Sequence, residues 1–325
     1  MISVLPEWAA HRAMWTAWPS HPEWWLEDLE PAREEIAAMV KALAKGEAVK
    51  VLATGTEHAD SARAAFDGYN VEVIETVFND IWLRDTAPIF AFEGKEKVAL
   101  GFINNGWGER FDFPLDKKVP AFVAERSGAR FIPHDLVLEG GSLDFNGEGT
   151  VLTTKQCLLN PNRNPGLSQA DIEARLKEFF GVSRVVWLED GLAGDHTDGH
   201  VDNIARFVGP NKVVCMSPSG KGDPNADVYA KIATDLKAQG FEVVRMPSPG
   251  LVADEEGEPV AASHMNFIIG NESVVMPSYE DVYAAQALAI LKDLFPDREV
   301  IALPSSGVLL GGGGSFHCIT QQEPA

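Results

Sequence analysis

The chain is poor in cysteine and in basic residues. Its 325 residues include three cysteines, Cys157, Cys215 and Cys318. An odd number of thiols does not make a disulfide framework, so we expect free thiols in a reducing compartment. The 27 lysines and arginines are outnumbered by 48 aspartates and glutamates, and the formal net charge is −21. This charge argues against nucleic acid and membrane surfaces as partners, because both are bound by clustered basic side chains. It favours small cations, although an acidic surface also serves solubility alone.

Long apolar stretches are absent as well. No stretch reaches the roughly 18 apolar residues of a membrane span. The N-terminal MISVLPEWAAHRAMW lacks the basic and apolar regions of a signal peptide. The sequence therefore predicts a cytoplasmic protein. With 45% apolar and 23% charged residues, a chain of this length can fold without disulfides or a structural metal.

A helix followed by a strand recurs five times along the chain. Apolar spacing predicts helices over residues 58–67, 117–127, 168–180, 226–239 and 280–294. Strand-like runs start at positions 71, 129, 184, 242 and 299, which are 55 to 58 residues apart. A constant period of this length indicates repeated supersecondary units. Equal units can close into a ring without polar end caps. We therefore predict one α/β domain over residues 1–325, a ring of five units of about 55 residues. A doubly wound sheet is the alternative.

Local signals mark the ends of two predicted helices. Ser168 precedes an acidic first turn and is predicted to be an N-cap. Gly181 and Gly240 follow the third and fourth helices, where a glycine in the left-handed conformation commonly ends a helix. Further strands are predicted within the periods, starting at positions 150, 212 and 273.

A loop rich in polar side chains follows each repeated strand. The loops carry, in chain order, Asp80, Trp82, Arg84 and Asp85; Glu139; Asp195, His196, Asp198, His200, Asp202 and Asn203; His264 and Asn266; and His317 and Cys318. In a ring these loops occupy equivalent places. We therefore expect Asp85, Glu139, His200, His264 and Cys318 to lie at one central cavity.

Cys318 differs from the other two cysteines in its surroundings. Four glycines, Gly311 to Gly314, stand shortly before it and allow close approach of the backbone. They are not a phosphate-binding loop, because no Lys-Ser/Thr follows. A thiol presented there is a candidate nucleophile, whereas Cys157 and Cys215 are expected to be buried apolar side chains.

The segment GDHTDGHVDN is the densest ionisable stretch, and three interpretations stay open. It is a solvated acidic turn, or His196, His200 and Asp202 bind a divalent metal. In the third interpretation His200 is a general acid and base, and Asp202 orients a cation. The metal hypothesis is weaker, because the spacing matches no zinc signature and leaves Cys318 and Glu139 without roles.

Three carboxylates in one cavity, those of Asp85, Glu139 and Asp202, would repel one another unless a cation lay among them. A guanidinium fits, because it is planar and offers several N–H donors. Trp82 could cover its face, although Arg84 paired with Asp85 would be a purely structural arrangement. A thiol, a histidine and carboxylates together indicate nucleophilic attack on a guanidinium carbon. The non-enzymatic alternative is a polyamine-binding module.

Five motifs carry a resemblance to a known family. The segments PEWAAHRAMWTAWP, NDIWLRDTAP, LEGGS, TDGHVDN and GGGGSFHCITQQEP resemble the agmatine deiminase and bacterial-type peptidylarginine deiminase family over nearly the whole chain. The resemblance implies a pentein, a five-bladed α/β propeller. It also implies a cysteine-dependent hydrolase of linear amidines in polyamine and putrescine biosynthesis, which acts on a small cationic guanidino substrate. Neither a metal nor an organic cofactor is implied, and a homodimer is one assembly it allows.

The motifs also assign roles to residues. By resemblance, Cys318 is the nucleophile, His200 the general acid and base, and Glu139 a further active-site carboxylate. Asp85 and Asp202 resemble the carboxylates that grip the guanidinium.

Other residues bear on the choice of substrate. Trp82 resembles the aromatic residue beside the substrate, and Asp198 and His196 are further substrate-binding candidates. His196 stands where the family usually has an acidic residue, and the loop before the cysteine carries an extra glycine and Phe316. The resemblance therefore favours agmatine as substrate and keeps free or peptidyl arginine as the alternative.

Overall fold

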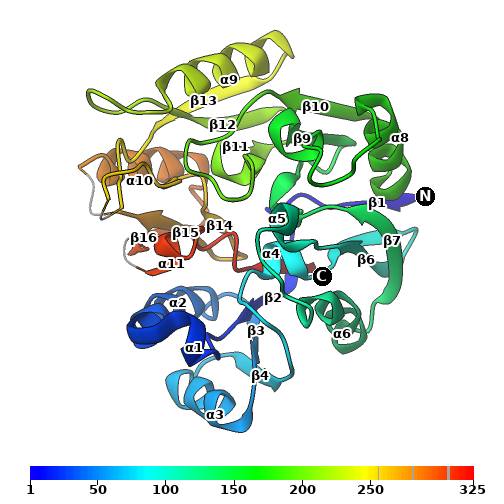
Figure 1. The fold of residues 1–325 in the computed structure, drawn as a ribbon, viewed down its shortest axis with the longest axis vertical. Helices are drawn as coiled ribbons and strands as arrows, with labels where there is room; N and C mark the ends of the chain where they lie inside the picture. Colours follow the sequence, from blue (N-terminus) through cyan, green and yellow to red (C-terminus); the bar gives the residue numbers. More distant parts are fainter. Residues whose placement is uncertain (255, 280–281, 306–307) are drawn as a thin grey trace.

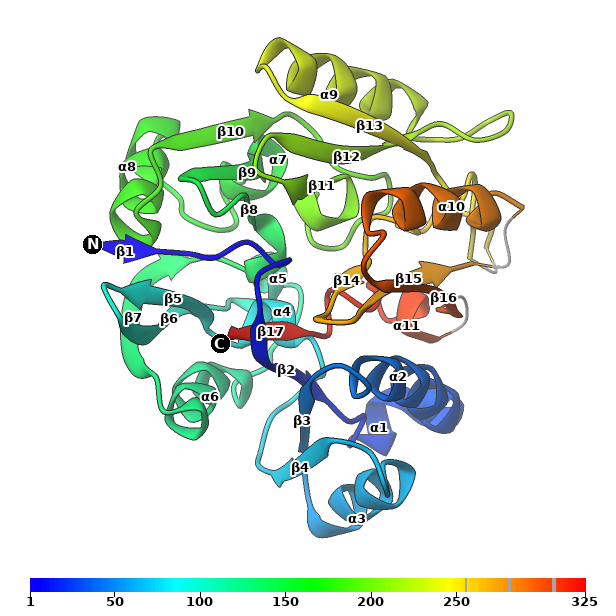
Figure 2. The same cartoon turned by 180° about the vertical axis from the view of Figure 1, so that it is seen from behind.

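The strands of the protein are divided among five sheets. The computed structural model describes residues 1–254, 256–279, 282–305 and 308–325. In this part of the chain the five sheets contain four, three, three, three and four strands. Figure 1 shows the five sheets following one another around a common centre in chain order, and Figure 2 shows the same arrangement from behind. The predicted α/β fold class is confirmed.

Each sheet is built on the same unit. Two antiparallel strands are followed by a helix, and the strand after the helix pairs parallel with the second strand. The first complete unit is β5 (Ile89–Glu93), β6 (Glu96–Ile103), α6 (Val119–Ser127) and β7 (Arg130–Val137), with β1 (Ile2–Ser3) at its edge. The second is β8 (Asp144–Phe145), β9 (Thr150–Thr154), α8 (Gln169–Phe180) and β10 (Arg184–Leu188). The third is β11 (Ala205–Gly209), β12 (Lys212–Ser217), α9 (Ala226–Ala238) and β13 (Glu242–Pro247). The fourth is β14 (Ile268–Ile269), β15 (Ser273–Ser278), α10 (Ala284–Leu294) and β16 (Glu299–Pro304).

The fifth sheet joins the two ends of the chain. It contains β17 (Gln321–Pro324), β2 (His11–Ala17), β3 (Ala48–Ala53) and β4 (Val71–Glu75), with helices α2 (Leu29–Leu43) and α3 (Thr56–Ala65). β17 pairs antiparallel with β2, so that Gln321 lies opposite Trp15. The Trp15 indole donates to Glu323 at 2.9 Å in the buried interior. Because β17 begins three residues after Cys318, this pairing fixes the position of the thiol.

The predicted helices and strands agree closely with the observed ones. Four of the five repeated strands start at the predicted residue, and β7 starts one residue later, at Arg130. Ser168 caps α8 through a reciprocal pair of hydrogen bonds with Asp171, and Gly181 ends that helix with φ of 67°. Part of the predicted helix 280–294 lies outside the described residues. The alternative of one doubly wound sheet is wrong for the described part of the chain, because its strands form five sheets.

Short helices connect the units at the centre and at the rim. They are α1 (Pro22–Trp25), α4 (Leu83–Thr86), α5 (Gly106–Glu109), α7 (Lys155–Leu158) and α11 (Val308–Gly311). Cys157 and Cys215 are fully buried, as predicted, and all three cysteines are free thiols. Within the described residues, none of the helices is both long and apolar enough to cross a membrane.

Candidate active site

An open pocket reaches Cys318 from the surface. It measures about 460 Å³ up to its mouth and is lined by Asp80, Trp82, Asp85, Trp107, Phe111, Phe113, His196, Thr197, Gly312, Gly313 and Cys318. Four of these are aromatic residues, and two are carboxylates. Asp85 and Cys318, 233 residues apart, face the same pocket as expected, whereas Glu139, His200 and His264 are not among the residues that line it.

Gly141 lies where three of the predicted site residues meet. A Cβ atom at this position would lie 2.5 Å from His200 Nδ1, 3.0 Å from Asp85 Oδ1 and 3.1 Å from Asp202 Oδ2. Only glycine fits there, because contacts this short do not occur. The Gly141 N–H also donates to Asp85 Oδ1 at 2.9 Å. The motif LEGGS thus supplies a backbone surface against which His200, Asp85 and Asp202 pack, in addition to Glu139.

The Cys318 thiol is held in a buried and acidic place. Its sulfur lies 3.9 Å from Asp202 Oδ2 and accepts a hydrogen bond from the Asn266 amide at 3.1 Å. Burial raises the pKa of this thiol well above its usual value, and the charges of Asp202 and Asp85 raise it further. The free protein therefore holds a neutral thiol at pH 7. A cation that neutralises the carboxylates would favour the thiolate.

Alkylation of Cys318 by iodoacetamide is expected to accelerate by about tenfold per pH unit and to be still accelerating at about pH 9, because only the thiolate reacts. Inactivation rates between neutral and alkaline pH measure this dependence. The Cys318→Ser variant reports any alkylation of the other two thiols. A rate that is already constant near pH 7 would show a preformed thiolate and contradict the expectation.

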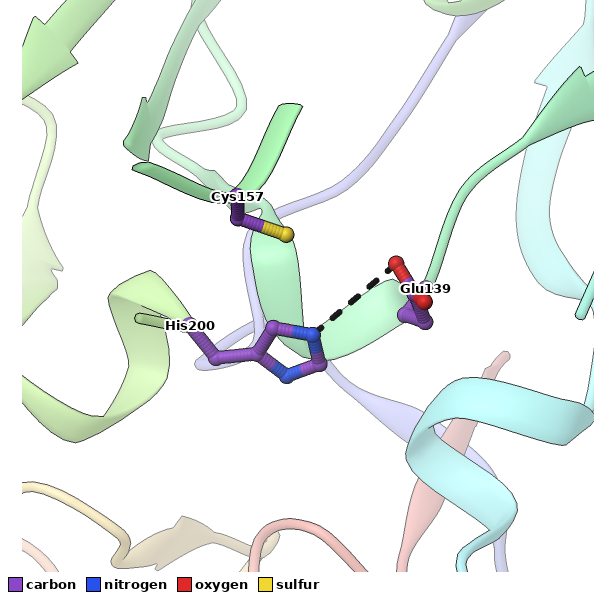
Figure 3. A group of neighbouring side chains, drawn as sticks. All are labelled: Glu139, Cys157 and His200. Atoms are coloured by element: carbon purple, nitrogen blue, oxygen red, sulfur yellow. Dashed lines mark ion pairs between the residues drawn. The ribbon is translucent and has the colours of Figure 1, made fainter. Parts of the chain in front are cut away.

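His200 is fully buried between two carboxylates. Its Nδ1 lies 3.8 Å from Asp85 Oδ1, and its Nε2 lies 4.0 Å from Glu139 Oε2. Figure 3 shows Glu139 and Cys157 beside the His200 ring, with the ion pair to Glu139 dashed. Burial opposes a charge on the ring, but Asp85, the Cys157 thiol and Glu139 outweigh it and hold the pKa of His200 well above its usual value. The ring is therefore an imidazolium at neutral pH and can donate a proton.

Glu139 is held by a residue that the sequence analysis did not single out. The buried Arg163 donates to Glu139 Oε1 at 2.7 Å and to Asp198 Oδ2 at 2.7 Å. Asp198 also accepts from Arg110 at 2.6 Å and Asn162 at 2.9 Å. Three donors thus occupy the Asp198 carboxylate, which positions Arg163 behind Glu139. The predicted role of Asp198 in substrate binding stays a prediction.

Asp202 has one free and one occupied oxygen. Its Oδ2 contacts His317 Nδ1 at 2.7 Å, whereas its buried Oδ1 has no hydrogen-bond partner among the residues described. Burial opposes the charge of Asp202, but His317 keeps its pKa below the usual value. An ionised, half-satisfied carboxylate beside the thiol is suited to accept a guanidinium N–H.

Two residues of the polar loops lie elsewhere than expected. His264 is buried with its Nδ1 2.9 Å from the Pro247 carbonyl oxygen and is not among the pocket residues, whereas Asn266 of the same loop reaches the thiol. Arg84 does not pair with Asp85. Its guanidinium donates to Gln321 at 2.8 Å, and its backbone N–H donates to the Cys318 carbonyl at 3.0 Å.

Trp82, His196 and Asp80 line the pocket together. The Trp82 indole N–H donates to Asp80 Oδ2 at 2.8 Å, and its ring lies against the glycine run before Cys318. His196 is exposed and lies close to Gly313. Burial raises the pKa of Asp80 to about 6, so that this carboxylate is mostly ionised at neutral pH. The backbone freedom expected of the glycine run is seen at Gly313, whose φ is 101°.

Among the described residues, the group that could hold a metal ion is not the predicted set of His196, His200 and Asp202. In the described part of the chain, the residues with ligating atoms within 4.8 Å of one another are Glu139, Cys157 and His200. Glu139 and Cys157 lie beside the His200 ring, and Glu139 is already paired with Arg163. The arrangement agrees better with a buried acid and base than with the predicted metal ligands.

The chain matches a family of known proteins over almost its whole length. Residues 3–324 match the Porphyromonas-type peptidyl-arginine deiminases. Agmatine deiminase of Pseudomonas aeruginosa is 39% identical over 98% of this chain and 94% of its own length. A substrate-bound cysteine-to-serine variant of C. jejuni agmatine deiminase superposes with a TM-score of 0.94 and 31% identity, covering 100% of this chain and 97% of that one. DDAH from Pseudomonas aeruginosa, at 13% identity and a TM-score of 0.52 over 96% of this chain and 99% of its own, shares the fold alone.

Proposed function

Because the chain belongs to the family of Porphyromonas-type peptidyl-arginine deiminases, we propose that it hydrolyses agmatine to N-carbamoylputrescine and ammonia. The observation that carries this proposal is an aromatic pocket lined by Cys318 and Asp85, with the buried Asp202 beside the thiol and the buried His200 beside Asp85. A relative with 39% identity over nearly the whole chain, named agmatine deiminase, supports the choice of substrate.

The first half of the proposed reaction forms a covalent intermediate. Asp85 and Asp202 bind the guanidinium N–H groups, and the substrate charge favours release of the thiol proton to water. The Cys318 thiolate attacks the guanidinium carbon and forms a C–S bond. The His200 imidazolium donates its proton to one nitrogen, the C–N bond breaks, and ammonia leaves. An S-alkylthiouronium on Cys318 and a neutral His200 remain.

The second half releases the product. Neutral His200 takes a proton from water, the resulting hydroxide attacks the thiouronium carbon, and the C–S bond breaks. The proton of the new hydroxyl group passes to the departing thiolate, so the products are the ureido compound and the regenerated thiol. Glu139, with Arg163 behind it, keeps the His200 ring in place and stabilises its charged form. Each step uses only substrate, water and these side chains.

The architecture is part of the proposal. We infer that the five units form one five-bladed α/β propeller, a pentein, over residues 1–325. The five sheets with one shared topology and the pairing of β17 with β2 support this inference. The homodimer and the cytoplasmic location stay predictions.

The pocket wall suggests which end group the substrate carries. Among the described residues that line it, none is a lysine or an arginine. A substrate with a carboxylate, such as free arginine, would therefore meet no cation except a protonated His196. The pocket wall contains two carboxylates, those of Asp85 and Asp80. Asp80 accepts hydrogen bonds from the Trp82 indole and the Ile81 backbone, whereas Asp85 accepts from the Trp107 indole and the Gly141 backbone, so different parts of the pocket wall hold the two carboxylates. We propose that Asp80 receives the distal ammonium of agmatine.

The Asp80→Asn substitution is expected to lower kcat/KM for agmatine by about 10- to 100-fold, which corresponds to a lost hydrogen bond between charged groups. For butylguanidine, which lacks the amine, kcat/KM should change by less than about threefold, because only the agmatine charge pairs with Asp80. Ammonia release measures both, together with arginine as a third substrate.

The exposed Asp112 near the mouth supplies a matched control, since Asp112→Asn removes the same charge without touching this pocket. Equal losses with both guanidines would assign Asp80 to the support of Trp82 instead. Faster turnover of arginine than of agmatine by the unaltered protein would exclude agmatine as the preferred substrate. Binding of agmatine without ammonia would support the polyamine-binding module.

A further inference from the structure

A buried chain of charged groups leads away from Asp202. Its Oδ2 contacts His317 Nδ1 at 2.7 Å, and His317 Nε2 contacts Glu7 Oε2 at 2.9 Å. All three side chains are buried. Glu7 also accepts from the guanidinium of Arg206, which pairs on its other side with Asp144 at 3.1 Å. The chain thus crosses from the active site to the N-terminal segment with alternating charge.

The hydrogen bonds define the protonation state of His317. Each ring nitrogen faces a carboxylate oxygen, which can only accept a hydrogen bond when ionised. Burial opposes the charge of Glu7, but Arg206 and His317 hold the pKa of Glu7 well below its usual value. The carboxylates at both ends of the ring are therefore ionised. Both contacts can be satisfied only when both ring nitrogens carry hydrogen, so His317 is an imidazolium.

Asp202 differs in this respect from the other two carboxylates at the site. Burial raises the pKa values of Asp85 and Glu139, whereas that of Asp202 is lowered although it is equally buried. The charged groups that act on Asp202 are His317, His200, Arg206, Arg84 and Asp85, and the Cys318 thiol is a further titratable group 3.9 Å from its Oδ2. Only His317 among the charged groups hydrogen-bonds to its carboxylate in the described part of the chain.

We propose that His317 is a positioning residue, kept charged by Glu7, which holds Asp202 ionised and turns its free Oδ1 toward the substrate guanidinium. The arrangement has a physical reason. The His200 imidazolium lies between Asp85 and Glu139, so Asp202 needs a cation of its own to stay ionised before substrate enters. His317 supplies that cation from behind the site, where it does not compete with the guanidinium for the free oxygen. The inference rests on the proposed deiminase function.

The His317→Gln substitution tests this role through the pH dependence of agmatine hydrolysis. Glutamine retains a donor for Asp202 but no charge, so the pKa of Asp202 should rise by about 1–3 units. The acid limb of the kcat/KM profile should then move to higher pH by a similar amount, and activity should recover partly at alkaline pH. Glu7→Gln should produce a smaller shift in the same direction, because His317 remains to donate through Nδ1.

His11 provides a matched structural control. This buried histidine lies 3.1 Å from Glu47 through Nδ1 and 2.7 Å from the Glu7 carbonyl through Nε2, but it has no contact with Asp202. His11→Gln should lower the melting temperature without moving the acid limb. If His317→Gln lowers kcat/KM equally at all pH values, with a fall in melting temperature like that of His11→Gln, then His317 is merely structural and the inference is wrong.

A second readout does not require turnover. Agmatine affinity of the Cys318→Ser protein, measured by calorimetry across pH, should weaken below neutral pH once His317→Gln is added. If the unaltered protein does not hydrolyse agmatine, the proposed function is wrong. If the unaltered protein is active but His317→Gln shifts neither the pH profile of kcat/KM nor the affinity for agmatine, only the proposed role of His317 is wrong.

Discussion

Replacement of Cys318 by serine is expected to abolish ammonia release from agmatine, with a loss of at least about 10⁴-fold in kcat. A serine hydroxyl at the same place is a far weaker nucleophile, and the surrounding acids Asp85 and Asp202 oppose its ionisation. Substrate binding should persist, because the carboxylates and the aromatic wall that hold the guanidinium are unaltered. Ammonia release and calorimetric titration with agmatine measure the two properties separately.

Cys215 is the matched control for this substitution. It is a buried free thiol in β12, and burial raises its pKa to about 11. It does not line the substrate pocket. Cys215→Ser should retain turnover within a few fold, even where the polar hydroxyl lowers stability. Substantial turnover by Cys318→Ser would exclude the nucleophile assignment and with it the covalent intermediate.

Replacement of His200 by alanine is expected to lower kcat for agmatine by about 10²–10⁴-fold, the usual contribution of a general acid and base. The loss has a pH signature. Because its pKa is raised, His200 is charged at neutral pH, and the ability to protonate the leaving nitrogen falls as pH rises through that pKa. The alkaline limb of the kcat profile in the unaltered protein should therefore disappear in His200→Ala. Steady-state kinetics across pH measure this change.

His134 is a suitable control for the loss of a histidine. It lies in β7, stacked on Phe102 and tilted against Phe179, and it does not line the substrate pocket. His134→Gln should keep the full pH profile. A His200→Ala variant with an unaltered alkaline limb would assign that limb to another group, with Cys318 the first candidate.

Much of the fold was predictable from local patterns. The strands at 71, 184, 242 and 299 follow from runs of β-branched residues, and the N-cap at Ser168 follows from its acidic first turn. These features depend on contacts between residues close in sequence, which a periodic pattern records. The ends of short central connections such as α5 were not predictable, because their backbone follows from packing around the pocket.

The supporting residues of the site were harder to find. Four residues support the site from 24 to 310 positions away in the sequence. The contacts join Arg163 to Glu139, Asn266 to Cys318, Gly141 to Asp85 and Glu7 to His317. Nothing in their local sequence distinguishes them, except that Asn266 and Gly141 lie within polar loops. His317 was seen as a polar neighbour of Cys318, but its contact with Glu7 depends on where the N-terminal segment crosses the centre of the molecule.

The sequence by itself determined the period of the fold and the chemistry at its centre, since a recurring strand and loop place a thiol, a histidine and acids at equivalent positions. The tertiary structure alone decided which of those acids are ionised and what holds them. Ionisation depends on burial and on charges within a few ångströms, and in this protein those charges come from segments that meet only when the fifth sheet joins the two ends of the chain.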